Sequence, residues 1–587
     1  MPLVSSITLK RGAVSWTPAS YDYNSGGRLI SKTGEDGITT TWTWDALNRY
    51  PLSQTLGGTL TSTAGWLPLV GVSSLTTPSG TTSTYTYDDE GRLVGERLNN
   101  RIRTRHSYRI SQDGDNRVTS YRYTSPTSCL SVVSRADGLG RIFATFTELS
   151  HGYTASAVTF DAMGRVWRRY APAPTADVAL GIGELAASAA AFHDDTHPYV
   201  EVEYEPSPRG IVCATTNAGD AWHSGGKAVR QRVLAGDAGV YRCPRYVIEG
   251  GGVRLAGDYS PGVLSVSESV DEDGVTVREF SDLRGLVVRK VIGSAATDFV
   301  YDGYGCLRYV LPPGLSIKGT MSRSDDCMER LAYWYDYDDR GRLIAKKLPG
   351  AAVAEYRYDP AGRLVAKRDG RLVGDTWHLF AYDGCGRQVA KYRCGMMDSE
   401  ITEFASVCRT ASLTMAADEY DRGGYALSPV PEAWPGDVVW AKYYDDYRFV
   451  AVRGLGTSFA FEATAAASAH ASATGLLTGM YTGSGYEAYY YDAEGREIQR
   501  CATGFNCGRR SSVYNYDGSL ARQEFTHPPG SGLGDIEKVY TYDRCGRLVS
   551  SVVRVSKARR VDIPIVSLAS LPDSVRLPST WAEASVS

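Results

Sequence analysis

A short motif that recurs along the chain limits its possible folds more than any other feature. The motif reads Tyr-x-Tyr-Asp-x-x-Gly-Arg-Leu. Copies begin at Tyr21, Tyr85, Tyr335, Tyr356, Tyr490 and Tyr540, and looser copies surround Asp45, Asp137, Asp161, Asp282, Asp302, Asp383 and Asp517. The Asp residues of neighbouring copies lie 21 to 26 positions apart, as Asp338 and Asp359 or Asp517 and Asp543 do. Such a period is typical of a tandem array in which each copy is one supersecondary unit.

The copy at residues 85–93 has a direct physical interpretation as a β-hairpin. Tyr85 and Tyr87 alternate, so both rings lie on one face of a strand. Asp88 begins a turn, because its carboxylate can accept a backbone N–H two residues on. Gly91 supplies the positive φ that closes the turn, and Arg92 can pair with Asp88. An exposed pair contributes only about 0–1 kcal/mol, so a β-branched residue in place of the Gly should destabilise more than loss of the Arg.

The composition supports many strands joined by tight turns. The chain has 39 Tyr against 13 Phe, and 62 Gly, in 587 residues. Tyrosine favours half-buried strands and glycine favours turns. Because an isolated hairpin is not stable, the repeats should pair into one long, winding antiparallel sheet. The predicted fold class is therefore all-β, with minor helical insertions, and the Ala-rich segments 177–192 and 459–480 are the best candidates for helices or other insertions.

The organisation along the chain follows from where the motif is present. We predict repeat blocks at residues 1–170, 200–450 and 486–555, Ala-rich insertions at 171–199 and 451–485, and a non-repeat Pro/Ser-rich tail at 556–587. A continuous sheet could run through all three repeat blocks.

Charge and hydropathy exclude several classes of function. Sixty-three basic residues nearly cancel 66 acidic ones, so the net charge of −3 gives no reason to expect nucleic-acid binding. The N-terminal residues lack the apolar core of a signal peptide, and no segment has the length and hydropathy of a membrane span. The eleven cysteines contain no C-x-x-C pair, which argues against a disulfide framework and a metal site.

The sequence predicts no catalytic, cofactor-binding or metal-binding residue, and no cofactor. The segment His193-Asp194-Asp195-Thr196-His197 has metal-capable side chains, but it is expected to be an exposed loop. Trp222-His223 and Trp377-His378 are expected to be packed within the sheet rather than catalytic. More than ten copies of one Asp-x-x-Gly element cannot all be active sites, and no nucleophile, phosphate-loop or zinc-protease motif is present. We therefore expect a protein that is not an enzyme.

The repeats resemble the YD/RHS repeat family from about residue 15 to about residue 555. Several further stretches look like Bacteroidetes-type RHS proteins: residues 204–209, 219–223, 309–313, 443–447 and 475–479. The resemblance implies a β-sheet strip that spirals into a hollow shell. It also implies a toxin cargo domain, covalent or separate, as a partner in a polymorphic toxin system, and a secreted or cell-surface location in a bacterium.

The chain departs from the toxin-bearing pattern of that family, because the repeats stop after Arg554. The segment that follows is too short for a toxin and lacks the Asp-Pro-x-Gly-rich plug of such proteins. We therefore expect a shell region truncated at its C-terminus. Two alternatives stay open: a surface adhesin whose Tyr and Trp rings bind glycans, and a truncated fragment without function.

Overall fold

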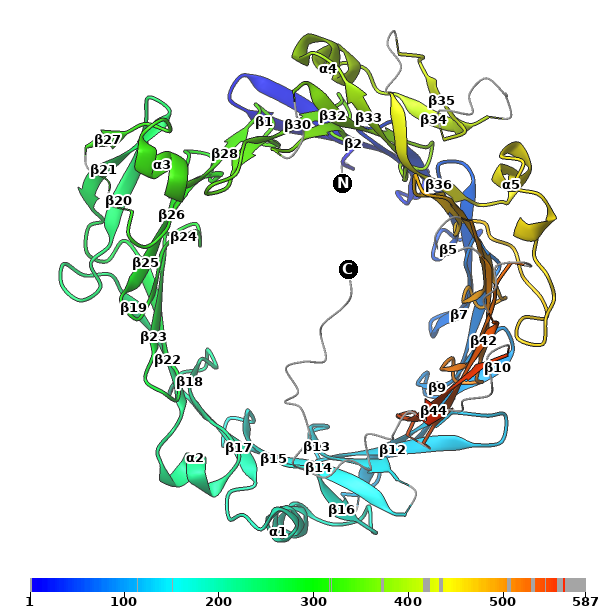
Figure 1. Ribbon diagram of the computed structural model, residues 1–587. Helices are drawn as coiled ribbons and strands as arrows, with labels where there is room; N and C mark the ends of the chain where they lie inside the picture. Colours follow the sequence, from blue (N-terminus) through cyan, green and yellow to red (C-terminus); the bar gives the residue numbers. More distant parts are fainter. Residues whose placement is uncertain are drawn as a thin grey trace.

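The computed structural model is built from one sheet that winds into a ring. The structure describes residues 3–556 except 113, 150, 316, 318, 371–373, 415–422, 432–435, 504–507, 529–533 and 544, together with the backbone of residues 563–564. Thirty-nine strands form a single sheet, and every pairing within it is antiparallel. Neighbours in the sheet are mostly neighbours in the chain, as the tandem hairpins predict. Figure 1 shows the strands standing around a central axis, and the predicted all-β spiral is confirmed.

The first half of the main sheet contains β1 (Ser6–Arg11), β2 (Val14–Tyr23), β3 (Leu29–Gly34), β4 (Thr39–Trp44), β5 (Pro51–Leu56), β6 (Leu60–Leu67), β7 (Gly71–Thr76), β8 (Thr82–Tyr87), β9 (Leu93–Leu98), β10 (Arg101–Arg109), β11 (Asn116–Tyr123), β12 (Cys129–Ala136), β13 (Ile142–Glu148), β14 (Tyr153–Phe160), β15 (Val166–Tyr170), β16 (Ala173–Thr175), β17 (Tyr199–Tyr204), β18 (Val212–Thr216), β19 (Val229–Ala235), β22 (Ser265–Val270), β23 (Thr276–Ser281) and β24 (Val287–Ile292).

The second half contains β25 (Ala295–Tyr301), β26 (Leu307–Leu311), β28 (Tyr333–Tyr337), β29 (Leu343–Lys347), β30 (Ala354–Tyr358), β31 (Leu364–Arg368), β32 (Thr376–Tyr382), β33 (Gln388–Gly395), β36 (Asp437–Tyr444), β37 (Leu477–Tyr481), β38 (Tyr486–Tyr491), β39 (Glu497–Ala502), β40 (Gly508–Tyr514), β41 (Leu520–Thr526), β42 (Ile536–Tyr542), β43 (Leu548–Val555) and β44 (Ile563–Pro564).

The remaining elements are excursions from the main sheet. A three-stranded sheet contains β20 (Pro244–Glu249), β21 (Gly252–Asp258) and β27 (Thr320–Met321). A two-stranded sheet contains β34 (Thr410–Leu413) and β35 (Tyr425–Ser428). The helices are α1 (Ile182–His193), α2 (Asp220–Ser224), α3 (Asp326–Leu331), α4 (Asp398–Ala405), α5 (Arg448–Val452) and the 3-10 turn η2 (Thr457–Phe459). Figure 1 shows α1, α2, α4, α5 and β34–β35 on the outside of the ring.

The two Ala-rich segments fold differently from each other. The first contains α1, whereas residues 460–476 of the second form no helix. Ser and Thr interrupt the alanines there, and their side chains compete for backbone hydrogen bonds, as Thr464 does by accepting the N–H groups of Ala466 and Ala467. Ala466 and Ala467 are buried, so small side chains let an irregular loop pack closely. Of the two alternatives for the second segment, a helix or an insertion, residues 460–476 therefore form an irregular insertion.

The repeated motif forms the predicted turn with one arrangement of hydrogen bonds. In the copy at Asp88, Gly91 has a φ of +77° and donates its N–H to the Asp88 carbonyl at 2.9 Å. One carboxylate oxygen of Asp88 accepts the N–H groups of Glu90 and Arg92 at 3.2 and 2.8 Å. The other accepts Nε of Arg92 at 2.8 Å. The predicted Asx-turn and the Asp–Arg pair are both confirmed.

Consecutive repeats are joined by contacts that the motif alone did not predict. The Tyr358 hydroxyl donates to the backbone carbonyl of Leu343 in the preceding repeat, at 2.9 Å. The guanidinium of Arg342, in that preceding repeat, lies 4.9 Å from the centre of the Tyr358 ring. Tyr108 repeats the hydrogen bond at 2.8 Å, and Trp44 makes it with its indole N–H at 2.8 Å. The hydrogen bond requires a donor at the tip of the aromatic ring, which Tyr and Trp supply. Phe160 occupies the same position before Asp161 and keeps the stacking, with the Arg141 guanidinium 4.4 Å from its ring centre.

The hydrophobic core lies on the outer face of the ring, beneath the excursions. Trp377, Leu379 and Ala381 of β32 are buried in a cluster that includes Ile401 and Phe404 of α4. A smaller cluster sets Phe146 of the main sheet against Leu185 of α1 in the same way. Because side chains alternate along a strand, the residues between these point to the inside of the ring.

A buried carboxyl on the outer face makes the stability depend on pH. Asp298 of β25 is 7% exposed, and burial raises its pKa to about 6 although Arg289 lies 3.4 Å away. A carboxyl with a raised pKa stabilises the fold below its unfolded pKa, and that contribution is lost as the pH rises through the folded pKa. We therefore expect Asp298→Asn to raise the unfolding temperature at pH 8 and to have little effect at pH 4.

Thermal unfolding of the two proteins across this pH range measures the effect. An equal shift at pH 4 and pH 8 would contradict the assignment, because only the ionised carboxylate is penalised by burial. Asp89→Asn, at an exposed position, is the control for a general effect of the substitution.

Candidate functional site: the closed wall and its seam

The sheet winds around the axis more than once. Its first and second windings contact each other along a line that we call the seam. Arg11, the last residue of β1, lies 3.3 Å from the Asp302 carboxylate and 4.5 Å from the centre of the Tyr304 ring. Glu35 pairs with Arg340, and the Thr59 hydroxyl lies 3.4 Å from Sγ of Cys385. These partners are 291, 305 and 326 residues apart in the chain. The wall is therefore closed around its circumference by contacts between distant repeats.

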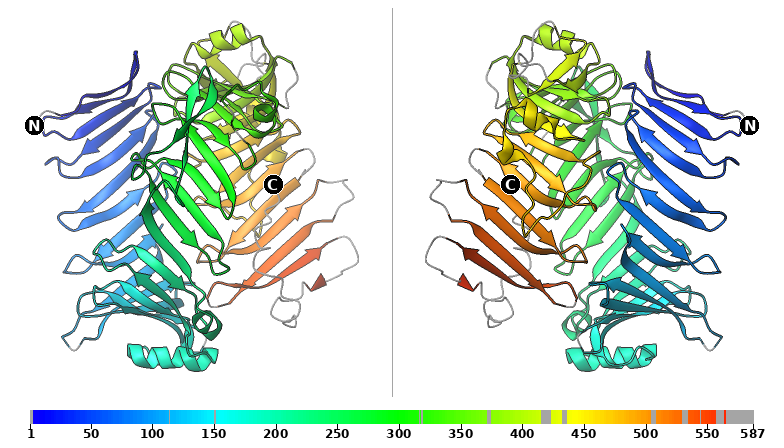
Figure 2. Two further views of the ribbon diagram at one scale, coloured as in Figure 1. Left: turned by 90° about the vertical axis from the view of Figure 1, so that its left-hand side faces the viewer. Right: turned by 90° about the vertical axis from the view of Figure 1, so that its right-hand side faces the viewer.

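The seam continues in the same order toward the C-terminal strands. Its further contacts join Thr81 to the carbonyl of Ala493 at 2.9 Å, Arg101 to Glu494, Arg103 to the carbonyl of Tyr516 at 3.3 Å, Arg122 to Asp517 at 3.9 Å, and Cys545 to the carbonyl of Glu148 at 3.7 Å. Figure 2 shows that the chain advances along the axis as it winds, with its blue and orange-red strands toward opposite ends. The two turns are thus joined along neighbouring rims.

The seam has the same kind of contact along its length, because each of the two windings contributes one kind of strand connection to it. The second winding of the sheet contributes the Tyr-Asp turns of its β-hairpins, such as residues 302–305, 338–341 and 383–386. The first winding of the sheet contributes the connections that lie at the other end of its strands, away from the Tyr-Asp turns, such as residues 34–37 and 57–59. The Asp-x-x-Gly elements therefore have two roles: they close the hairpins, and they form one side of the seam.

Charge reversal at the seam should destabilise the wall, and a charge swap should restore it. Glu35 and Arg340 have side chains that are 22% and 25% exposed, so solvent screens the pair only in part. We expect Glu35→Arg or Arg340→Glu alone to lower stability by about 1–2 kcal/mol, and the double exchange to recover most of the loss. Thermal unfolding of the three variants measures this. Additive losses in the double exchange would contradict the contact.

Asp195 and His197, two of the residues considered above as metal ligands, lie in a small cluster with Asp220. Asp195, His197 and Asp220 place one ligand atom each within 4.8 Å of one another. One Asp195 oxygen accepts the N–H of His197 at 2.7 Å, and the other accepts the N–H of Asp220 at 2.9 Å. Nδ1 of His197 lies 2.7 Å from the Asp220 carboxylate. The cluster thus fastens the loop before β17 to the start of α2.

The electrostatics of this cluster follow from those hydrogen bonds. The Thr196 hydroxyl and His197 hold the pKa of Asp220 well below its usual range. Rings of His197 and His223 stack, with centroids 4.5 Å apart. His193 lies apart, at the end of α1, with Nε2 3.0 Å from the carbonyl of Pro172. The contribution of Asp220 could not be found from the spacing of the first segment, because it comes from a different loop.

The two Trp-His pairs differ in their surroundings. Trp377 is fully buried in the outer core, whereas His378 is half-buried and lies on the inner face. Trp222 and His223 lie in α2, where both are half-buried and Nε2 of His223 is 3.3 Å from the carbonyl of Tyr199. For Trp377 the expected packing within the sheet is confirmed; Trp222 belongs to a helix instead.

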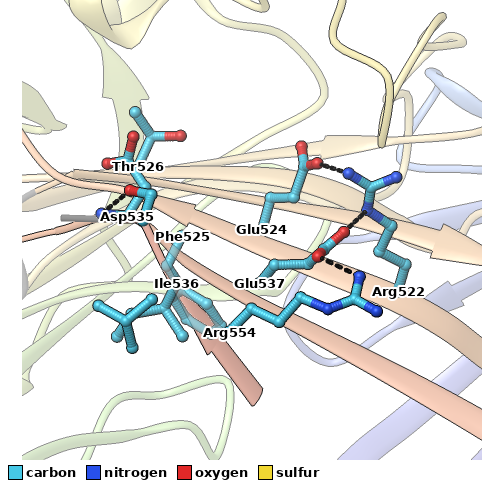
Figure 3. Close-up of a pocket in the computed structure, with 10 residues that line it drawn as sticks. Arg522, Glu524, Phe525, Thr526, Asp535, Ile536, Glu537 and Arg554 are labelled. Carbon is cyan, nitrogen blue, oxygen red and sulfur yellow. Dashed lines mark hydrogen bonds and ion pairs between the residues drawn. The ribbon is translucent and has the colours of Figure 1, made fainter. Parts of the chain in front are cut away.

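A groove of about 830 Å³ lies on the outer face of the last strands (Figure 3). Glu537 on its floor joins two cations: its carboxylate is 2.7 Å from Nε of Arg522 and 3.0 Å from Nη1 of Arg554. Arg522 also pairs with Glu524. These charges neutralise one another across β41–β43. The polar side chains of the groove therefore form a cross-strand ion network with one another.

Two family models match parts of the chain. The RHS repeat model matches residues 23–61, 69–101 and 337–372, and a domain of unknown function, DUF6443, matches residues 108–235. No curated protein matches the chain. The described helices include none that is long and apolar enough to cross a membrane.

Two solved structures are similar over nearly the whole chain. A Tc holotoxin pore of Photorhabdus luminescens, carrying a mutation in TccC3, has 11% identity and a TM-score of 0.62 over 95% of this chain and 29% of that one. The crystal structure of TcdB2-TccC3 has 14% identity and a TM-score of 0.49 over 94% of this chain and 30% of that one. The chain thus spans less than a third of the length of these structures.

The repeats, the spiral sheet and the shared fold agree. The chain contains RHS repeats, and its winding antiparallel sheet shares the fold of the holotoxin structure.

Proposed function

We propose that this protein is the wall of a container that encloses a polypeptide cargo, as part of a bacterial toxin delivery system, and that it acts without a catalytic step. The observation that carries the proposal is the seam. Contacts from Arg11–Asp302 to Glu148–Cys545 join repeats about 290 to 410 residues apart, so the strip forms a closed wall rather than an open solenoid. An adhesin or a linear scaffold would not require its distant repeats to meet.

The distribution of side chains supports the same role. The outer face carries the apolar core and its covering helices, and the inner face is lined by the Tyr rings of the motif and by polar residues. A container needs stability that does not depend on its contents, and this fold buries its core on the side away from them. The likeness to a Tc holotoxin pore supports the toxin-related setting.

The proposal is tested on the native gene product, recovered from its source with an antibody against this region. We expect its mass to exceed 63.8 kDa, or a second polypeptide to copurify. The additional polypeptide should resist trypsin in the intact protein and become sensitive when seam residues such as Arg340 are reversed in charge. A native product of 63.8 kDa with no copurifying polypeptide would contradict an enclosed cargo.

A further inference from the structure

Five basic side chains follow one another across neighbouring strands on the inner face of the second turn. They are Lys346 of β29, Lys367 of β31, His378 of β32, Lys391 of β33 and Lys442 of β36, which we call the basic stripe. The register sets Lys367 opposite His378, and sets Lys391 between Phe380 and Trp440. Their inward direction follows from alternation, because Trp377, Leu379 and Ala390 on the same strands are buried in the outer core that contains α4.

The stripe has little compensating negative charge, unlike other parts of the inner face. Glu279 pairs with Lys290 at 2.7 Å across β23–β24, and Glu497 pairs with Arg500 at 2.9 Å on β39. Within the stripe, Lys367 has Asp369 at 3.7 Å. Among the residues that the structure describes, Lys346, Lys391 and Lys442 have no carboxylate within ion-pair distance.

These like charges act against one another. Burial, reinforced by Lys391, Lys367 and Arg393 and opposed by Asp369, lowers the pKa of His378. Burial and the neighbouring Lys367 lower the pKa of Lys391, again against Asp369. The register sets Lys367 directly opposite His378, and the other lysines lie on neighbouring strands, so the row is less favourable in an empty wall than beside an anion. The side chains are half-buried rather than covered, which leaves their ammonium groups accessible from the inside.

We infer that the basic stripe binds an acidic segment of the enclosed polypeptide, and this inference rests on the proposed function. Adjacent strands are about 4.8 Å apart, so the six strands from β29 to β36 form a track roughly 24 Å wide for a chain that crosses them. The cations are mainly Lys, a point charge without the fixed fork of Arg, which suits an anionic chain held without one fixed conformation. Phe380 and Trp440 add apolar surface between the charges.

A polypeptide fits these observations better than a nucleic acid does. The stripe holds four lysines and a His of lowered pKa, whereas nucleic-acid sites cluster a larger basic excess and favour Arg for phosphate.

The test uses the full chain and a fluorescein-labelled peptide of twenty glutamates, with a twenty-nucleotide oligo-dT as the competing polyanion. Fluorescence anisotropy at low salt gives the affinities, and a carbodiimide links peptide carboxylates to the lysines they contact, which mass spectrometry identifies. The triple variant Lys367→Gln, Lys391→Gln, Lys442→Gln removes most of the stripe. Lys290→Gln is the matched control, because Lys290 is on the inner face but already paired with Glu279.

We expect the peptide to bind the unaltered chain and Lys290→Gln alike, to bind the triple variant at least tenfold more weakly, and to crosslink to Lys346, Lys367, Lys391 and Lys442. Equal binding to the triple variant, or tighter binding of oligo-dT than of the peptide, would overturn the inference. The same preparations carry Thr59→Cys, which forms a disulfide with Cys385 only if the seam is closed. If the chain with all its lysines in place forms this disulfide but does not bind the peptide, the stripe alone is overturned, whereas absence of the disulfide overturns the enclosure as well.

Discussion

Replacing Asp359 with Ala is expected to lower the stability of the protein by about 3–5 kcal/mol, the largest effect of any single turn residue. Asp359 is 0% exposed, and the side chain of its partner Arg363 is 11% exposed. The carboxylate accepts the backbone N–H of Arg363 at 2.9 Å and its Nε at 2.7 Å. The substitution would leave a buried guanidinium without its anion and a buried N–H without its acceptor.

The chain supplies a matched control with the same motif in an exposed setting. The side chains of Asp543 and Arg547 are 25% and 75% exposed, yet the two make the same hydrogen bonds at 2.8 and 2.6 Å. We expect Asp543→Ala to cost far less stability than Asp359→Ala, because solvent screens the pair and hydrates the remaining cation. Denaturant unfolding of both variants makes the comparison. Equal losses would show that burial does not set the strength of the Asp–Arg pair.

Replacing Gly479 with Val is expected to disrupt the outer core beneath α5. A Cβ atom at Gly479 would lie 2.1 Å from Cζ of Phe449, which is fully buried and stacks on Tyr443 with ring centroids 4.4 Å apart. Valine has a higher β-strand propensity than glycine, so the substitution would favour the strand conformation of β37. The loss therefore comes from the clash of the new side chain with Phe449. We expect a loss of about 3 kcal/mol or more, because Phe449 has to leave its place over the sheet.

Gly395→Ala provides the control for adding a side chain to a strand glycine. Gly395 ends β33, and a Cβ atom there would meet nothing within 4 Å. We expect this change to be neutral or slightly stabilising, since alanine restricts the unfolded chain more than glycine does. Hydrogen exchange of β36–β38 then reports whether Gly479→Val loosens the neighbouring strands specifically. Unchanged exchange there would contradict the packing argument.

The sequence was sufficient to predict the local structure of the repeats. Strand alternation, the Asx-turn at Asp88 and the positive φ of Gly91 depend on a few adjacent residues, so a single copy of the motif predicts them. The Asp–Arg pair was predicted as well, but its strength was not. Arg363 is nearly buried and Arg547 is exposed, and this difference depends on covering segments far away in the chain.

The contacts between repeats and between turns could not be predicted in the same way. The spacing between Arg342 and Tyr358 holds a signal for their stacking, since a cation and a ring recur at similar offsets in Arg92 and Tyr108. The seam has no such signal, because which repeats meet depends on the curvature summed over all the strands of one turn. The inner position of the basic stripe likewise depends on which face α4 covers.

The most direct test of the closed wall is a disulfide across the seam. The Thr59 hydroxyl lies 3.4 Å from Sγ of Cys385, so Thr59→Cys would place two thiols within reach of each other although the residues are 326 positions apart. Mass spectrometry after mild oxidation of the folded variant should identify a peptide pair that joins positions 59 and 385, and Thr59→Cys with Cys385→Ser should give none. Formation of that crosslink is the predicted result; free thiols at both positions in the folded, oxidised protein would contradict the closed wall.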